Sequence, residues 1–117
     1  MLRFLKATLN SWNGFRAAAR SEEAFRQEIV AFLIAVPAAF LVATDTWRRV
    51  ALIGVVLLLM IVELLNTAVE KLSDHVTPFH HDAIGRIKDM ASAAVGLSLL
   101  LAGFVWLVAL AERFGLL

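Results

Sequence analysis

Long runs of uncharged, apolar residues constrain this chain more than any other feature of its sequence. From Met90 to Ala111 about 22 residues follow one another without a charge, and about 20 apolar residues are enough for a helix to cross a bilayer. Hydrophobic residues make up 61% of the chain and charged residues 18%. A small soluble domain buries only about 60–70% of its chain area, too little to hide this much apolar surface. The sequence therefore predicts an integral membrane protein.

Two further apolar runs predict two more membrane-spanning helices. The uncharged run over 29–44 reaches a spanning length when it is extended back to Ala24, and Pro37 inside it is a kink that membrane helices tolerate. The other run begins at Val50 and keeps its helical periodicity beyond Val62. The predicted fold is therefore all-α, with three membrane-spanning helices. The predicted spans cover about 24–44, 48–72 and 86–111 of a single domain, residues 1–117.

Residues 1–20 predict an amphipathic helix that lies in the membrane interface. Leu2, Leu5 and Trp12 fall on one face at helical spacing, while Arg3 and Lys6 fall on another. The alternative is a helix that packs on a soluble core, but the composition leaves little material for such a core. We therefore expect a surface helix whose cations lie near anionic lipid headgroups.

Polar residues predict the boundaries between the helices. Ser21 followed by Glu22 is typical of a helix start, with the Ser21 hydroxyl as the N-cap. The polar and charged residues at 45–49, between two apolar runs, indicate a short turn. Residues 73–84 contain Pro78 and all three histidines, and they predict a loop.

The distribution of lysine and arginine predicts the orientation in the membrane. The N-terminal segment carries Arg3, Lys6, Arg16, Arg20 and Arg26. The second loop region carries three more cations, whereas the 45–49 turn has two and the C-terminus one. Because cytoplasmic segments are enriched in Lys and Arg, we expect the N-terminus and the second loop to be cytoplasmic. The small residues that open the third span favour close helix contact. Three spans cannot enclose much of a pocket, so we also expect an oligomer.

The overall charge and the lack of cysteine exclude several function classes. The net charge is +1, which gives no indication of nucleic-acid binding. There is no Cys, so the chain has neither disulfides nor a thiolate metal site. The three histidines are more typical of a solvated loop than of a metal site.

Glu63, Asn66 and Glu70 are the candidate chemical group of this sequence. Their spacing places them within about 60° of one another around a helix. A carboxylate at bilayer depth costs about 2.5–3.5 kcal/mol, so its presence favours a function. The alternative is a helix end whose acids face water. Two carboxylates on one helix face suit a divalent metal ion such as Mg²⁺, or proton handling.

Further charged groups are expected at the same side of the membrane. Glu22 precedes the first span, and Lys88 and Asp89 open the third. Acids, an amide and a cation together match the parts of phosphoryl transfer, which depends mainly on positioning and charge neutralisation. No Walker-type or dinucleotide-binding glycine motif is present, so an ATP site would lie outside the familiar kinase folds.

These segments resemble a known family when they are read together. The pattern E-x-x-N-x-x-x-E within residues 61–70, then Asp74, then residues 85–95 with their Lys-Asp pair, is similar to the signature of prokaryotic diacylglycerol kinases. Residues 12–18 and 23–28 resemble the N-terminal segments of the same family. The resemblance covers nearly the whole chain, and the combination of motifs is much more specific than any one of them.

The resemblance implies a homotrimeric lipid kinase of the bacterial inner membrane that phosphorylates diacylglycerol to phosphatidic acid with ATP and Mg²⁺. It implies Glu63 as the catalytic base, Glu22 and Glu70 as metal ligands, and Asn66 as a supporting residue. The implied ATP site comprises Arg3, Asn10, Glu22, Glu70, Phe79, His80, His81, Lys88 and Asp89. The implied lipid site comprises Arg3, Trp12, Arg16, Ala17, Ala18, Ala19, Ala24, Phe25, Arg26, Gln27, Glu28, Arg49, Glu63 and Ser92.

Other functions are compatible with the sequence alone. A kinase of the same fold that acts on undecaprenol would need identical chemistry. A small proton-coupled transporter would also keep a membrane carboxylate such as Glu63, but it would not need Glu22, Glu70 and Lys88 on one side. A membrane assembly factor without chemistry is a third reading.

Overall fold

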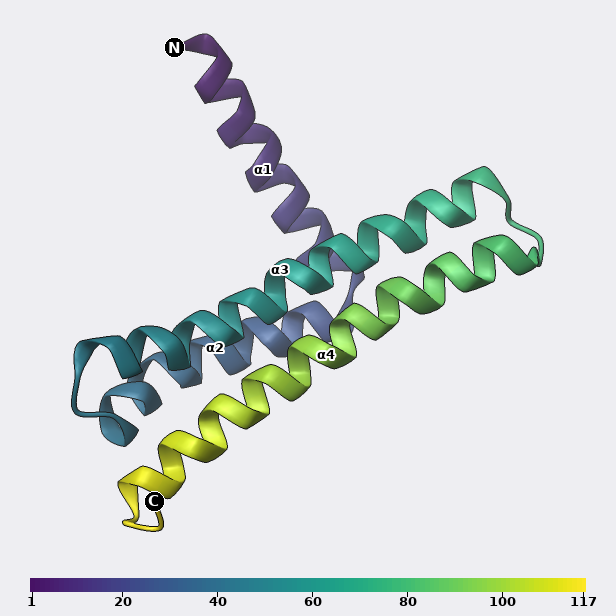
Figure 1. Ribbon diagram of the computed structural model, residues 1–117. Coiled ribbons are helices and arrows are strands. Elements are labelled where there is room, and N and C mark those ends of the chain that lie inside the picture. The colour runs from purple at the N-terminus through teal and green to yellow at the C-terminus, as the bar shows by residue number, and fades with distance from the viewer.

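The chain consists of four helices and no strands, and the computed structural model describes residues 1–117. The helices are α1 (Leu2–Ser21), α2 (Glu23–Val42), α3 (Thr46–Val76) and α4 (Asp82–Arg113). The last three run alongside one another, and α1 projects away from them at the start of α2 (Figure 1). Three helices, α2, α3 and α4, are long and apolar enough to cross a membrane. The predicted all-α fold, with three spans after an N-terminal helix, is confirmed.

Small residues bring the three spans together near the α2–α3 turn. Ala39, Ala43, Leu52 and Ala109 form a buried cluster at this end of the bundle. Trp106 of α4 reaches across to α3, where its indole Nε1 donates a hydrogen bond of 3.0 Å to the carbonyl of Leu52. Alanines in α2 and α4 thus leave room for the larger side chains of α3, as is usual where membrane helices pack closely.

A second buried cluster joins α1 to the spans. Phe25 is fully buried and packs with Ala18 of α1 and Met60 of α3. Phe15 meets the edge of the Phe25 ring, with a centroid distance of 5.1 Å. Phe25 therefore lies where three helices meet, at the base of the projecting helix α1.

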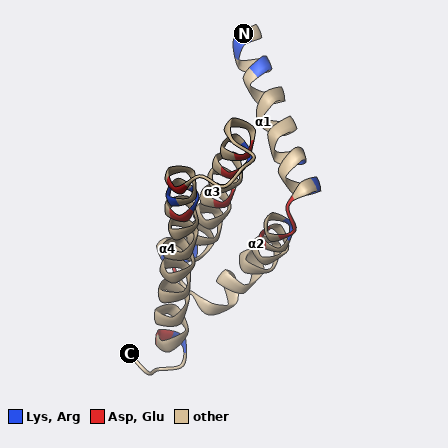
Figure 2. Ribbon diagram, turned by 90° about the vertical axis from the view of Figure 1, so that its right-hand side faces the viewer, with Lys and Arg blue, Asp and Glu red and all other residues tan.

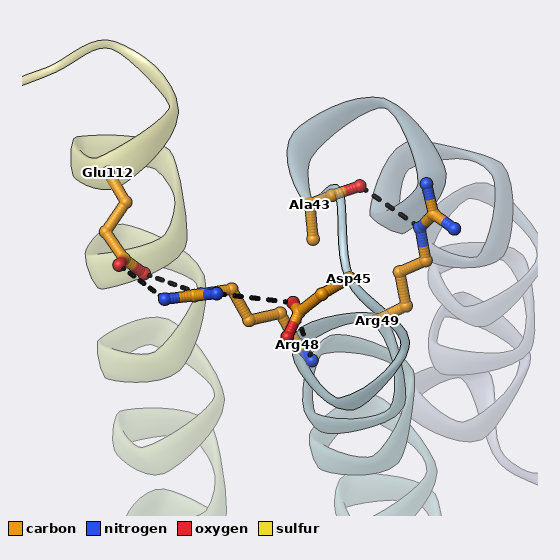
Figure 3. A network of polar contacts seen from close by, with 5 residues as sticks. All are labelled: Ala43, Asp45, Arg48, Arg49 and Glu112. Carbon is orange, nitrogen blue, oxygen red and sulfur yellow. Dashed lines mark hydrogen bonds and ion pairs between the residues drawn. The ribbon is translucent and has the colours of Figure 1, made fainter.

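A polar network closes the end of the bundle that carries the α2–α3 turn (Figure 3). Arg48 donates from Nε and Nη2 to the two carboxylate oxygens of Glu112, at 3.2 and 3.0 Å. Asp45 is the N-cap of α3 and accepts a hydrogen bond from the backbone N–H of Arg48. The polar turn predicted over 45–49 is therefore wrong in part. The Asp45 cap lets α3 begin at Thr46, so these residues already form its first turn.

Two other predicted boundaries differ from the structure. Ser21 is the last residue of α1, and its hydroxyl donates to the carbonyl of Ala17 instead of capping α2. Glu22, in an extended conformation, is the N-cap residue of α2 and makes no side-chain cap. The loop predicted over 73–84 is shorter, because α3 continues to Val76 and α4 begins at Asp82.

Candidate active site

The buried side of α3 changes from apolar to polar along its length. Leu52, Val56, Leu59 and Met60 are buried in its first half. Glu63, Asn66, Thr67 and Ser73 are buried in its second half. Acidic residues gather in the second half of α3 and at the start of α4, toward the turn that joins these two helices (Figure 2). The polar part of this side of α3 therefore defines the candidate site.

Glu63 lies at the boundary between the two halves. Its side chain follows Met60 by one turn, and Met60 packs against Phe25 and Ala18. Only 7% of Glu63 is exposed. A carboxylate directly beside an apolar cluster is costly unless a partner or a ligand compensates it.

Asn66 and Glu70 form a hydrogen-bonded pair one turn apart on α3. The Asn66 amide Nδ2 donates to Glu70 Oε1 at 3.1 Å, so it fixes one orientation of the Glu70 carboxylate. The other amide atom, Asn66 Oδ1, is buried and has no hydrogen-bond partner, and the same holds for Glu28 Oε1 on α2. Buried acceptors are nearly always satisfied in native proteins. These two oxygens are therefore free to accept a hydrogen bond from a group outside this chain.

The oxygen donors of this region fit Mg²⁺ in chemical type. Mg²⁺ prefers oxygen ligands and usually takes only one or two protein carboxylates, with phosphates and waters as the other ligands. Glu22 and Glu70 are carboxylates of this kind, and Asn66 Oδ1 is an unpaired oxygen one helical turn before Glu70. No group of three or more His, Cys, Asp or Glu side chains is arranged to hold a metal ion. A complete shell would therefore need oxygens from a nucleotide or from water.

Glu22 occupies the single non-helical residue between α1 and α2. Lys71 of α3 approaches it, with 3.6 Å between Lys71 Nζ and Glu22 Oε1. The same ammonium group donates to the hydroxyl of Ser21 at 3.3 Å. Lys71, which follows Glu70 directly, thus connects the α1–α2 junction to α3.

Lys88 is held beside the end of α3 by Asp74, which the sequence places in the family pattern without a role of its own. Its ammonium donates to Asp74 Oδ1 at 2.8 Å, which joins the start of α4 to the end of α3. The signal for Asp74 was its position one turn after Glu70, on the same helix. A cavity of about 170 Å³ lies here, lined by Asp74, Thr77, Pro78, Phe79, His80, His81, Ile84, Gly85 and Lys88. The structure therefore brings four of the residues assigned to the ATP site around one cavity.

The two loop histidines also have structural partners. His81 is the N-cap of α4, and its Nδ1 accepts a hydrogen bond from the backbone N–H of Ala83 at 3.2 Å. His80 Nε2 lies 3.2 Å from Asp82 Oδ1. Phe79 is 81% exposed at the rim of the same loop. These contacts shape the loop and leave the aromatic ring accessible to a ligand.

The largest cavity lies between α1 and α3. It measures about 620 Å³ and is lined by Ser11, Gly14, Phe15, Ala17, Ala18, Leu64, Thr67, Ala68 and Lys71. Ala17 and Ala18 were assigned to the lipid site, and Ala19 and Phe25 belong to the adjacent apolar cluster. Leu64 and Thr67 were missed, although they follow Glu63 by one and four residues. The buried Glu63 therefore lies on the same helix as the wall of a mainly apolar cavity.

Arg26 supports this arrangement from α2. Its Nη1 donates to the carbonyls of Ala19 and Arg20, each at 2.9 Å. These carbonyls are at the C-terminal end of α1, where a cation is favourable. Arg26 thus stabilises the junction between the two helices.

Several assigned residues lie apart from this group within one chain. Arg49 is at the opposite end of α3, where its guanidinium donates to the carbonyl of Ala43 and lies 4.7 Å from the centre of the Phe40 ring. It is about 21 Å along the helix from Glu63. Trp12 is exposed and stacks on Phe15. The other assigned residues whose side chains are exposed are Arg3, Asn10, Arg16, Ala24, Gln27, Asp89 and Ser92.

The fold and the site define a multi-span membrane protein with a carboxylate-rich site beside an apolar cavity near one end of its helices. The sequence model of the prokaryotic diacylglycerol kinases matches residues 9–110. The chain belongs to the prokaryotic diacylglycerol kinase family.

Its relatives match along nearly their whole length. The diacylglycerol kinase of Escherichia coli strain K12 is 46% identical over 113 residues, which cover 97% of this chain and 93% of the relative. The diacylglycerol kinase of Pseudomonas aeruginosa is 41% identical, over 89% of this chain and 85% of the relative. That of Haemophilus influenzae is 35% identical, over 91% and 90%.

Proposed function

We propose that this protein transfers the terminal phosphoryl group of ATP to the hydroxyl of diacylglycerol, with phosphatidic acid and ADP as products. The observation that carries the proposal is the position of Glu63, buried beside an apolar cluster and one turn before the Asn66–Glu70 pair. The names of the relatives support the choice of reaction and acceptor. The whole chain, residues 1–117, would form a single lipid kinase domain.

Glu63 is the proposed general base. The acceptor hydroxyl attacks the terminal phosphorus of ATP, the bond from that phosphorus to the ADP oxygen breaks, and the hydroxyl proton passes to the Glu63 carboxylate. A positioned base of this kind contributes roughly 10²–10⁴-fold to a rate. The cavity between α1 and α3 would accept the apolar part of the lipid, because its wall includes Phe15, Ala18 and Leu64.

Glu22 and Glu70 are the proposed Mg²⁺ ligands, and the metal ion would neutralise charge on the ATP phosphates. Asn66 supports this role, since its amide already orients Glu70. Lys88, which is hydrogen-bonded to Asp74, would bind oxygens of the ATP phosphates. Phe79, His80 and His81 would shape the adjoining nucleotide cavity.

We also propose that the chain works as a homotrimer. Ala93, Ala94 and Gly96 form an exposed small-residue stretch of α4 that no other helix of the chain covers, and such stretches favour contact between membrane helices. Arg3, Asn10 and Asp89 would then reach an active site that is shared with a neighbouring subunit. The distribution of Lys and Arg supports a cytoplasmic N-terminus in a bacterial inner membrane.

A lipid kinase assay with two acceptors tests this function. Purified protein in mixed micelles is given Mg²⁺ and ATP labelled in its terminal phosphate, together with either diacylglycerol or undecaprenol. We expect labelled phosphatidic acid and much slower labelling of undecaprenol. No labelled lipid phosphate from either acceptor would contradict the kinase proposal, and a preference for undecaprenol would contradict the choice of substrate.

A further inference from the structure

Lys71 has no assigned role in the sequence or in the proposed reaction, yet it makes the contact that links two parts of the site. Its Nζ donates to Ser21 Oγ at 3.3 Å and lies 3.6 Å from Glu22 Oε1. Ser21 ends α1, and Glu22 is the only residue between α1 and α2. Lys71 itself follows Glu70 directly on α3. One side chain therefore connects the helix junction that carries Glu22 to the helix that carries Glu70.

No other polar side-chain contact does this. The hydrogen bonds of Arg26 to Ala19 and Arg20 join α2 to α1, and they leave the position of both helices relative to α3 free. The remaining contacts across this junction are apolar, through Phe15, Ala18 and Phe25. A hydrogen bond adds to these contacts a preferred distance and direction between two atoms. Lys71 thus supplies the only side-chain hydrogen bond and ion pair between this junction and α3.

The charge of Lys71 also suits this place. Glu22 and Glu70 are both acids, and a cation between their helices offsets the repulsion that would otherwise separate them. Lys71 also lines the cavity between α1 and α3. Loss of the contact would loosen both the metal ligand and the cavity wall.

We propose that Lys71 is a positioning residue that holds Glu22 and the end of α1 against α3 through its contacts with Ser21 and Glu22. The inference rests on the proposed role of Glu22 as a metal ligand. It predicts that Lys71 acts through Glu22 without touching the reacting atoms. Arginine has the reach and charge to keep the contact, whereas methionine keeps the length of the chain without its charge.

The first test measures the geometry without nucleotide or metal. The chain has no cysteine, so nitroxide labels can be attached to single cysteines at the exposed positions Thr8 of α1 and Leu65 of α3. Labelled protein is diluted in unlabelled protein, so that the measured distances lie within one subunit. We expect a narrow distance distribution for the original sequence and for Lys71→Arg, and a clearly broader one for Lys71→Met. Equal distributions for all three would overturn the proposal.

The second test measures Mn²⁺ binding in the presence of a non-hydrolysable ATP analogue. Residues that orient metal ligands change metal affinity by roughly 10–100-fold, so we expect Lys71→Met to weaken binding about tenfold and Lys71→Arg to restore it. Lys6→Met is the matched control, because Lys6 is an exposed cation of α1 outside this contact. Equal loss in the control would overturn the specific role of Lys71. Unchanged binding in Glu22→Gln would instead overturn Glu22 as a ligand, while the distance measurement still judges the contact itself.

Discussion

Replacement of Asn66 by leucine tests the orientation of Glu70. The change keeps a side chain that branches at Cγ, although a somewhat larger one, and removes the 3.1 Å hydrogen bond from Asn66 Nδ2 to Glu70 Oε1. A hydrogen bond to a charged group is worth about 1.5–3 kcal/mol. Glu70 is only half-buried, so we take the lower value, about 1.5 kcal/mol, which corresponds to about tenfold in an equilibrium or rate constant.

The assay follows phosphatidic acid formation at a series of Mg²⁺ concentrations. We expect Asn66→Leu to raise the Mg²⁺ concentration for half-maximal activity about tenfold. Ser98→Ala is the matched control, because it removes another buried polar group, the Ser98 hydroxyl, which bonds within its own helix at 2.9 Å. An unchanged Mg²⁺ requirement in Asn66→Leu would refute the argument that Asn66 prepares Glu70 for a metal ion.

Three further predictions concern the other parts of the site. Glu70→Gln should raise the Mg²⁺ requirement or eliminate activity in the same titration, and an unchanged requirement would remove Glu70 from the metal site. A mixture of Asp89→Asn and Glu63→Gln subunits should recover activity that neither has alone, because Asp89 is the residue proposed to reach the site from a neighbouring subunit, whereas continued inactivity would speak against a shared site. Phe25→Ala should destabilise the protein by about 3 kcal/mol, since Phe25 is fully buried between three helices. Unfolding in detergent measures this loss, and a stability equal to that of the original chain would contradict the packing described for α1.

The sequence predicted the spans and the shared face of α3 because both depend on local periodicity. The spacing of Asn66 and Glu70 places them one turn apart on any helix, and the structure has them hydrogen-bonded. The uncharged run that begins at Met90 likewise lies within a single helix, α4. Such features need no knowledge of how the helices pack.

Boundaries and contacts between helices could not be predicted in the same way. A serine followed by acids is typical of an N-cap, but Ser21 bonds back to Ala17 and remains in α1. The pairs Lys71–Glu22 and Lys88–Asp74 join residues from different helices, and their partners depend on the angle at which the helices pack. No periodicity in the chain specifies that angle.

The rate of Glu63→Gln with diacylglycerol and Mg-ATP tests the central claim most directly. The variant keeps the shape of a side chain that is 7% exposed but removes its ability to accept a proton. We expect phosphatidic acid formation to fall by roughly 10²–10⁴-fold, with nucleotide binding and the oligomer unchanged. A variant that forms phosphatidic acid at the original rate would contradict the role of Glu63 as the base.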